Sequence, residues 1–400
     1  MRRLTNWVYL LAVLAINFTL FRPSPVDVLF VTAGLLAICS GQIVTRNMLI
    51  VWALLLTWLG SLVVSSITLI DDPEVTYQMV KISFAVSIGF CSSLVAAHWR
   101  EAELTRFLRV FVLAACAAAT LGIIGFVLGI EDLLWDGRAK AFLDDPNMYA
   151  AFLIPGGLGC MYLLSRRERP ILYSAVLVWL VFGMMVSFSR AAIVSFLIWG
   201  AVYYVVINRR NLPRATVYAI AAIAVVAVAI LCGSVFIEGF ADKLADRTTL
   251  AKPYDLGHGG RYGRYALSIP FILDNPLGMG LLQIDHYFDE PIHNIFLSSF
   301  LNYGWLAGIA FTLLIIFTVA ISIANYRVTR NQILLCTFFC WIAILSCAFL
   351  HEAERWRHLW LFTGLVWGLN AGRLMARRPE EPVPPARAPS VFVPPQPLPA

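Results

Sequence analysis

The chain has 400 residues, of which 60% are hydrophobic and only 14% are charged. A composition this apolar cannot be buried in one soluble core, so the sequence excludes an ordinary soluble protein and predicts a membrane protein. The formal net charge of +6 is carried by 26 arginines and 4 lysines against 24 acidic residues. Because a guanidinium group binds phosphate oxygens through two parallel hydrogen bonds, this excess of arginine points to anionic ligands.

Twelve apolar segments are predicted to cross the membrane as helices, because backbone groups in hydrocarbon have to be satisfied within their own segment. They cover residues 6–21, 26–44, 48–70, 77–97, 107–130, 147–164, 171–188, 191–207, 216–237, 292–324, 333–350 and 359–374. The first segment resembles a signal peptide, but no small-residue cleavage site follows it and we expect it to be retained. The predicted fold is an all-α, polytopic membrane bundle over residues 1–378.

The loops that follow the even-numbered segments are basic, which places them and both termini in the cytoplasm. Their arginines include Arg46, Arg100, Arg166, Arg209 and Arg327. The long loop 238–291, between the ninth and tenth segments, then lies on the opposite face. Residues 379–400 are rich in proline and are predicted to form a disordered cytoplasmic tail.

Neither a metal nor a cofactor is predicted. All eight cysteines fall inside apolar segments, where they are expected to be packing residues. The loop 351–358 lacks the second histidine of a His-Glu-x-x-His zinc site, and no phosphate-binding glycine loop or Gly-x-Ser-x-Gly motif occurs. A phosphate-bearing substrate would therefore have to be neutralised by arginine, and nucleic acid is not an expected partner.

Several arginines break the positive-inside pattern because they are predicted to lie on the non-cytoplasmic face. They are Arg138, Arg190, Arg261, Arg264, Arg355 and Arg357. Positive charge on that face opposes membrane insertion and needs another reason to be there, so together these residues predict an external basic cavity. For Arg190, which has almost no loop around it, the alternative is an arginine that contacts ordinary lipid headgroups.

Residues 259–265 are predicted to open a short helix that ends at 274–276. A spacing of three places Arg261 and Arg264 on one face of this helix, which suits an extended anion such as a pyrophosphate. The alternative is a solvated face with salt bridges to Asp242, Asp246 or Asp255.

His293 is predicted to lie in the first turn of the unusually long tenth helix. The positive end of the helix dipole would keep its imidazole neutral and able to accept a proton. The alternative is a structural histidine fixed by hydrogen bonds.

Three segments together resemble the O-antigen ligase and O-antigen polymerase superfamily. They are Ser189-Arg190-Ala191, then Gly260-Arg261 with Tyr265 and the Asn-Pro-Leu-Gly-Met-Gly run at 275–280, and then His293-Asn294 followed by Leu297, Gly304 and Gly308. Asp145-Pro146-Asn147 is a weaker fourth match. The resemblance covers roughly residues 144–308, and Tyr265 stands where the family more often has tryptophan.

This resemblance implies an inverting glycosyltransferase of the bacterial inner membrane that needs neither metal nor nucleotide. It would move a glycan from a polyprenyl (undecaprenyl) pyrophosphate carrier to a hydroxyl acceptor at the periplasmic face. Arg190 and Arg261, with Arg264, would bind the pyrophosphate, and His293 would act as general base. Further candidate substrate contacts are Arg138, Asn294, Arg355 and Arg357. For Arg355 and Arg357 the alternative, which the mixture of acidic, basic and aromatic residues in 351–358 favours, is an ion-paired loop with an aromatic residue at the membrane interface.

The expected partners are the lipid-linked glycan donor, a glycan or lipid A core acceptor, membrane lipid and a polysaccharide-assembly complex. The motifs do not separate a ligase from a polymerase of O-antigen or exopolysaccharide. A transporter or flippase for lipid-linked or anionic solutes is the alternative from another class, and a scaffold is a third. Against a transporter, arginine and histidine gather at the outer ends of helices and not at mid-membrane.

Overall fold

The computed structural model describes residues 1–18, 24–41, 44–209, 239–248 and 260–375, with single residues and short stretches between 213 and 235. Within these residues the protein is helical, apart from an antiparallel hairpin of β1 (Leu134–Trp135) and β2 (Arg138–Ala139). The predicted all-α fold is confirmed. Most of the ninth predicted segment, part of the loop 238–291 and the whole tail 379–400 lie outside the described residues.

The first half of the chain forms long helices whose starts are set by proline and capping residues. They are α1 (Arg2–Leu14), α2 (Pro25–Cys39), α3 (Arg46–Ser66) with a 3-10 turn (Ile67–Leu69), α4 (Pro73–Ala96), α5 (Glu101–Leu128), a 3-10 turn (Glu131–Leu133) and, after the hairpin, α6 (Pro146–Ser165). Asp72 and Asp145 cap α4 and α6, because their carboxylates accept hydrogen bonds from the first backbone N–H groups of these helices.

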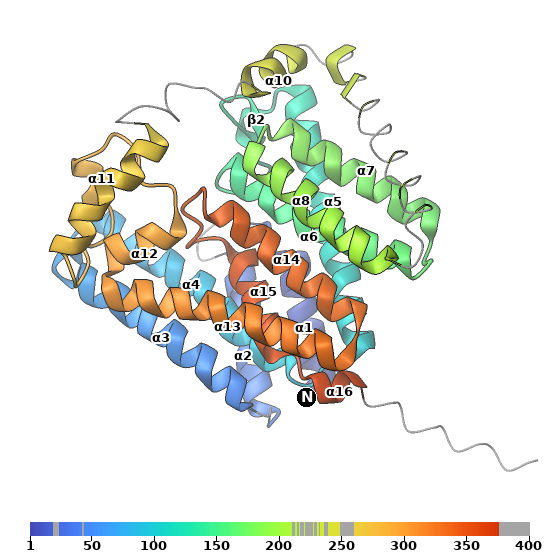
Figure 1. Ribbon diagram of the computed structural model, residues 1–400, viewed down its shortest axis with the longest axis horizontal. Helices are drawn as coiled ribbons and strands as arrows, with labels where there is room; N and C mark the ends of the chain where they lie inside the picture. The colour runs from blue at the N-terminus through green and yellow to red at the C-terminus, as the bar shows by residue number, and fades with distance from the viewer. Residues whose placement is uncertain are drawn as a thin grey trace, which may run out of the picture.

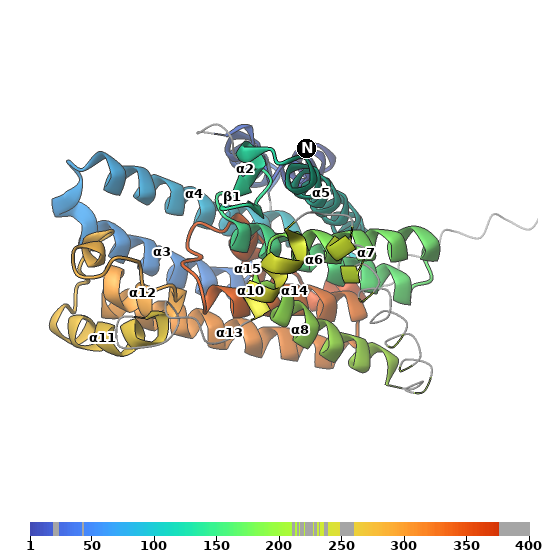
Figure 2. The same cartoon turned by 90° about the horizontal axis from the view of Figure 1, so that it is seen from above.

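The second half contains helices of more varied length. They are α7 (Pro170–Val186), α8 (Arg190–Asn208), α10 (Phe240–Thr248), α11 (Arg261–Asp274), a 3-10 turn (Gln283–His286), α12 (Ile295–Tyr303), α13 (Trp305–Thr329), α14 (Gln332–Ala348), α15 (Arg357–Gly368) and α16 (Ala371–Met375). Figures 1 and 2 show α11 and α12 side by side at one end of the molecule, next to α3.

Among the described residues, six helices are long and apolar enough to cross a membrane, as judged from length and composition. They are α3 with its 3-10 turn, α4, α5, α6, α8 and α13, whereas α2, α7 and α14 are apolar but shorter. Large apolar side chains such as Leu197, Ile198 and Leu306 are exposed on α8 and α13, as expected of surfaces that face lipid. The protein is thus a multi-pass membrane protein, and the count of twelve crossings stays a prediction.

The tenth predicted segment is not one helix. Gly304 interrupts the run 292–324 and separates α12 from α13. Its φ of +88° is a conformation that glycine adopts readily and L-residues rarely do. The Trp305 N–H does not continue the ladder of α12 but donates to the carbonyl oxygen of Pro276, at 2.9 Å. Hydropathy misses this break because the residues around Gly304 are apolar.

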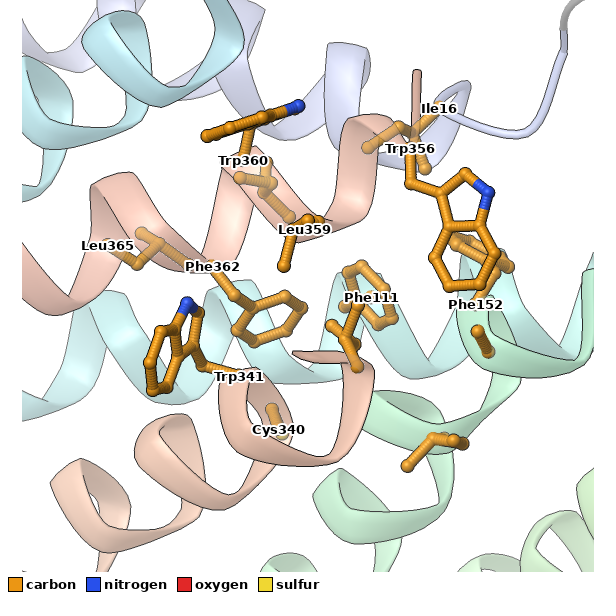
Figure 3. Close-up of a cluster of buried hydrophobic side chains, with 14 of the residues drawn as sticks. Ile16, Phe111, Phe152, Cys340, Trp341, Trp356, Leu359, Trp360, Phe362 and Leu365 are labelled. Carbon is orange, nitrogen blue, oxygen red and sulfur yellow. The ribbon is translucent and has the colours of Figure 1, made fainter. Parts of the chain in front are cut away.

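Helix α15 occupies the centre of the bundle, and all of its residues are buried. Figure 3 shows Leu359 and Phe362 of α15 in one apolar cluster with Phe111 of α5, Phe152 of α6 and Trp341 of α14. With 12 residues, α15 is only about 18 Å long, against about 30 Å for the hydrocarbon core of a bilayer. The twelfth predicted segment, 359–374, is therefore also divided, because α15 ends at Gly368 and α16 begins at Ala371.

Small residues allow α15 to pack closely against α4. A Cβ atom at Gly364 would overlap the carbonyl oxygen of Gly89, and one at Gly368 would overlap the backbone of Ser93. The two helices thus meet through a small-xxx-small seam, Gly364 and Gly368 against Gly89 and Ser93. The backbones approach each other so closely that even one methyl group does not fit.

We expect Gly364→Ala to lower the melting temperature of the protein in detergent, because overpacking a close helix contact costs about 1–3 kcal/mol. Gly60→Ala is the matched control, since Gly60 lies inside α3 and a Cβ there meets no atom within 4 Å. The control should leave stability unchanged or raise it, because alanine favours a helix over glycine. Unfolding is followed by tryptophan fluorescence. Equal melting temperatures for the two variants would contradict the close packing of α15 against α4 at Gly364.

Candidate functional site

Residues 276–280 follow α11 in the chain and form backbone hydrogen bonds with the end of α12. We call this segment the 276–280 clamp. The N–H groups of Met279 and Gly280 donate to the carbonyl oxygens of Leu301 and Asn302, at 2.9 and 3.0 Å. Gly278 has a φ of +87°, and a side chain there would overlap the carbonyl oxygen of Asn302. The glycines of the Pro-Leu-Gly-Met-Gly run are thus required by the close approach of two backbones, and the clamp sets where α11 lies.

Helix α11 begins at Arg261 after Gly260, as the sequence predicts. The Arg264 side chain is only 5% exposed, and it donates to the carbonyl oxygen of Glu290 at 2.8 Å and to its carboxylate Oε2 at 2.7 Å. Glu290 was not among the predicted partners of this arginine. The hydrogen bond from Arg264 lowers the pKa of Glu290, so the pair is held as an ion pair.

His293 lies just before α12 and not in its first turn, so its predicted position was wrong. The cap of α12 is Asn294, whose Oδ1 accepts hydrogen bonds from the N–H groups of Phe296 and Leu297. His293 itself has a φ of +53°, in the left-handed region. Its carbonyl oxygen accepts a hydrogen bond of 3.1 Å from the Tyr265 hydroxyl, which ties the histidine to α11.

The imidazole of His293 is neutral at neutral pH. Burial and then the positive charge of Arg261 lower its pKa to about 4, while Glu290 acts in the opposite direction. The Nε2 atom of His293 lies 4.0 Å from Oε2 of Glu290. The sequence predicted a neutral histidine, but the cause differs: desolvation and a nearby guanidinium lower the pKa, and the helix dipole is not needed.

His351 is a second histidine of the site, and sequence reasoning missed it. Its ring centroid lies 6.4 Å from that of His293, and the residue is 9% exposed. Burial, and then Arg261, His293 and Arg138, lower its pKa well below the ordinary value. Three distant parts of the chain therefore surround His351. The loop 351–358 gave a signal, but its histidines were considered only as zinc ligands and its arginines as ion-pair partners or substrate contacts.

Arg138 contacts the turn that precedes Arg190 at the start of α8. The Nε atom of Arg138 donates to the carbonyl oxygen of Ser187 at 2.8 Å, and its Nη2 donates to Oδ1 of Asn147 at 3.1 Å. Arg190 starts α8 three residues after Ser187 and is partly buried. Arg138 donates a hydrogen bond to this turn, and its positive charge also lowers the pKa of His351. The structure therefore brings the turn before Arg190 to the same side of the bundle as His293.

The remaining candidates have other contacts. Arg357 forms a buried ion pair with Asp27, at 2.7 Å, and also binds Ser24, so it fixes α15 to the start of α2. Arg355 donates to Oε1 of Gln78 in α4 at 3.4 Å. Asn294 is the cap described above. The structure therefore gathers Arg261, Arg264 and His293 around Glu290, and assigns Arg357 to the core.

We predict that chemical modification of His293 by diethyl pyrocarbonate, which requires neutral imidazole, persists well below pH 6. The extent of modification, read by mass spectrometry, should fall with a midpoint near the pKa of about 4. In Arg261→Gln the midpoint should rise, because the substitution removes a positive charge that disfavours the imidazolium. N-acetylhistidine serves as the reference for the reagent. A midpoint near 6.5 in the protein without the substitution would contradict the buried environment of His293 beside Arg261.

Comparison with known families gives a match that covers part of the candidate site. Residues 175–312 match the profile of the family described as O-Antigen ligase, and no curated protein matches the chain. The matched segment contains Arg190, Arg261, Arg264 and His293, whereas Arg138 and His351 lie outside it. It also contains the 276–280 clamp and the Gly304 break. Residues 175–312 are thus similar to the O-antigen ligase family, and this match supports a ligase- or polymerase-type membrane glycosyltransferase.

Proposed function

We propose that this protein transfers a glycan from a polyprenyl pyrophosphate carrier to a hydroxyl group of an acceptor, with inversion, at the periplasmic face of the bacterial inner membrane. The observation that carries the proposal is the neutral His293 held beside Arg261 and the Arg264–Glu290 pair. A neutral imidazole can accept a proton, and guanidinium groups can bind a pyrophosphate. Both lie within the segment that matches the family.

In the proposed reaction, the acceptor oxygen attacks the anomeric carbon of the donor sugar. A new C–O glycosidic bond forms while the bond between that carbon and the phosphate oxygen breaks, and the pyrophosphate leaves with the electron pair. The acceptor proton passes to Nε2 of His293. Glu290, 4.0 Å from this nitrogen, favours the resulting imidazolium.

The arginines have two proposed effects. Arg190 and Arg261 bind the pyrophosphate and stabilise the negative charge that builds on it as the bond breaks. Arg261 also lowers the pKa of His293 in the ligand-free protein. A bound pyrophosphate offsets this positive charge, so the donor itself makes His293 a stronger base. Proton transfer is then coupled to the presence of the donor.

Arg264 has a different proposed role from Arg261. Its guanidinium is engaged with Glu290 through two hydrogen bonds and is nearly buried. We therefore assign to Arg264 the role of positioning Glu290 beside His293. Arg261 is then the arginine of α11 that contacts the substrate. Arg138 adds a positive charge, and His351 adds a neutral imidazole, to the wall of the proposed pocket.

His293→Ala should abolish glycan transfer, because it removes the proton acceptor, and general-base catalysis contributes about 100- to 10,000-fold in rate. Transfer is followed in membranes supplied with a lipid-linked glycan donor and acceptor. The control is His286→Ala, which removes an exposed histidine of the same loop. If His293→Ala inserts, folds and retains full activity, the proposed base is wrong.

Arg190→Lys and Arg261→Lys should each lose most transfer activity while keeping the positive charge, because lysine cannot make the two parallel hydrogen bonds of a guanidinium. Arg327→Lys, at an exposed position near the end of α13, is the matched control and should remain active. Unchanged activity in Arg190→Lys would favour an arginine that contacts ordinary lipid headgroups.

A deletion strain separates the acceptors. Loss of all polymer from lipid A on a gel would support a ligase, and retention of a single repeat unit would support a polymerase. Unchanged lipid A profiles with loss of another surface glycan would support an exopolysaccharide polymerase. An unchanged set of surface glycans would contradict the proposed function.

A further inference from the structure

A cavity of about 290 Å³ lies at the end of α4 that is opposite to the site of His293. The start of α4 carries Gln78, which contacts Arg355, whereas the cavity reaches Val95 at the other end of this helix. The 24 residues of α4 span about 36 Å, which is close to the thickness of a bilayer core. The residues of this cavity that matter here are Arg2, His98, Trp99, Arg100, Glu103 and Arg373.

The cavity is positively charged. Three arginines and one glutamate line it, which gives 3 − 1 = +2. His98 adds no charge at neutral pH, because burial and then Arg373 and Arg2 lower its pKa. Glu103 caps α5 by accepting a hydrogen bond of 3.0 Å from the N–H of Arg100. In the described part of the chain, none of the three arginines forms an ion pair.

The walls of the cavity are fixed by contacts between helices that are distant in sequence. The Nη1 atom of Arg373 lies 2.9 Å from Nδ1 of His98, and the indole N–H of Trp99 donates to Oδ1 of Asn6 at 3.1 Å. Trp99 is 2% exposed. The contacts fix His98, Trp99 and Arg373 in the wall of the cavity, and Arg2 and Arg100 line the same space from α1 and the start of α5.

The same end of the bundle carries further basic loops. Arg166, after α6, lies 3.8 Å from Glu101 at the start of α5, and Asn331, before α14, donates to the same carboxylate at 3.0 Å. Loops that the sequence assigns to one face are thus brought together. A cavity at the ends of the helices lies level with the phosphates of the adjacent lipid leaflet.

We propose that this cavity is a binding site for a phosphate-ester anion, either the headgroup of an anionic lipid or a free phosphate. Its volume is about ten times the roughly 30 Å³ that one water molecule occupies in the liquid, so it admits a phosphate group with part of its ester. Guanidinium groups match phosphate oxygens in geometry and charge. The proposal concerns the face opposite to the transfer site and does not rest on the transfer chemistry.

The test measures the melting temperature of the purified full-length protein in nonionic detergent during three titrations. The probes are dioctanoyl phosphatidylglycerol, dioctanoyl phosphatidylcholine and sodium phosphate. We expect phosphatidylglycerol to raise the melting temperature more than phosphatidylcholine does. In Arg2→Gln/Arg100→Gln, the concentration that gives half of this rise should increase at least about tenfold, since each arginine near an anionic headgroup contributes about 1 kcal/mol.

The matched control is Arg3→Gln/Arg106→Gln, which removes two positive charges from α1 and α5 at exposed positions that do not line the cavity. It should respond to phosphatidylglycerol as the unmodified protein does. If Arg2→Gln/Arg100→Gln does not fold, Arg373→Gln supplies the same comparison without changing α1 or α5. A response to sodium phosphate that the cavity variant loses supports a free-phosphate site, and a response to the anionic lipid alone supports a lipid site. Equal responses of the cavity and control variants overturn the proposal, and so do equal responses to the two lipids when sodium phosphate gives no response.

Discussion

The geometry of the candidate site depends on the backbone contact between the 276–280 clamp and the end of α12. This contact consists of hydrogen bonds between main-chain groups at Met279, Gly280, Leu301 and Asn302. Each such bond contributes only about 1 kcal/mol net, but leaving the buried groups without partners would cost more. Because α11 precedes the clamp and His293 precedes α12, the contact fixes the arginines and the histidine relative to each other.

The glycines of this region therefore act through the backbone and not through the substrate. Gly278 and Gly304 face each other, and a side chain at either would overlap the main chain of the other segment. The family motif at 275–280 accordingly has a structural explanation. It positions α11 relative to α12, while Arg261 and His293 carry the chemistry in the proposed function.

In the sequence, the pattern of charges was the most informative signal for the position of the candidate site. The arginines that oppose the positive-inside rule include those that gather near His293, and the helix at Arg261 begins where its glycine predicts. Hydropathy was less informative about helix ends, because an average over a window does not register one glycine with a positive φ. The break at Gly304 was hidden for this reason, whereas α15 ends at Gly368 without a positive φ, and His293 was misplaced because α12 begins only at Ile295.

The electrostatic partners of the site could not be predicted from spacing. Glu290 meets Arg264 across 26 residues, and His351 approaches His293 across 58. Such contacts arise from how helices pack and leave no local periodicity in the chain. Arg357 shows the converse, since its place in an arginine-rich loop indicated a ligand contact while the structure pairs it with Asp27. For residues of this kind, only the tertiary arrangement separates a core ion pair from a binding group.

The burial of α15 has a consequence for how the protein is made. A helix of 12 residues with Arg357 and His358 at its start is a poor substrate for independent insertion, because charged groups are costly in lipid. Asp27, the ion-pair partner of Arg357, is synthesised more than 300 residues earlier. We therefore expect α15 to enter the membrane last, into a cleft that α4, α5 and α14 have already formed. Completion of the core would then be the final step of biogenesis, and until that step the earlier helices would depend on lipid or a membrane chaperone to cover their inner faces.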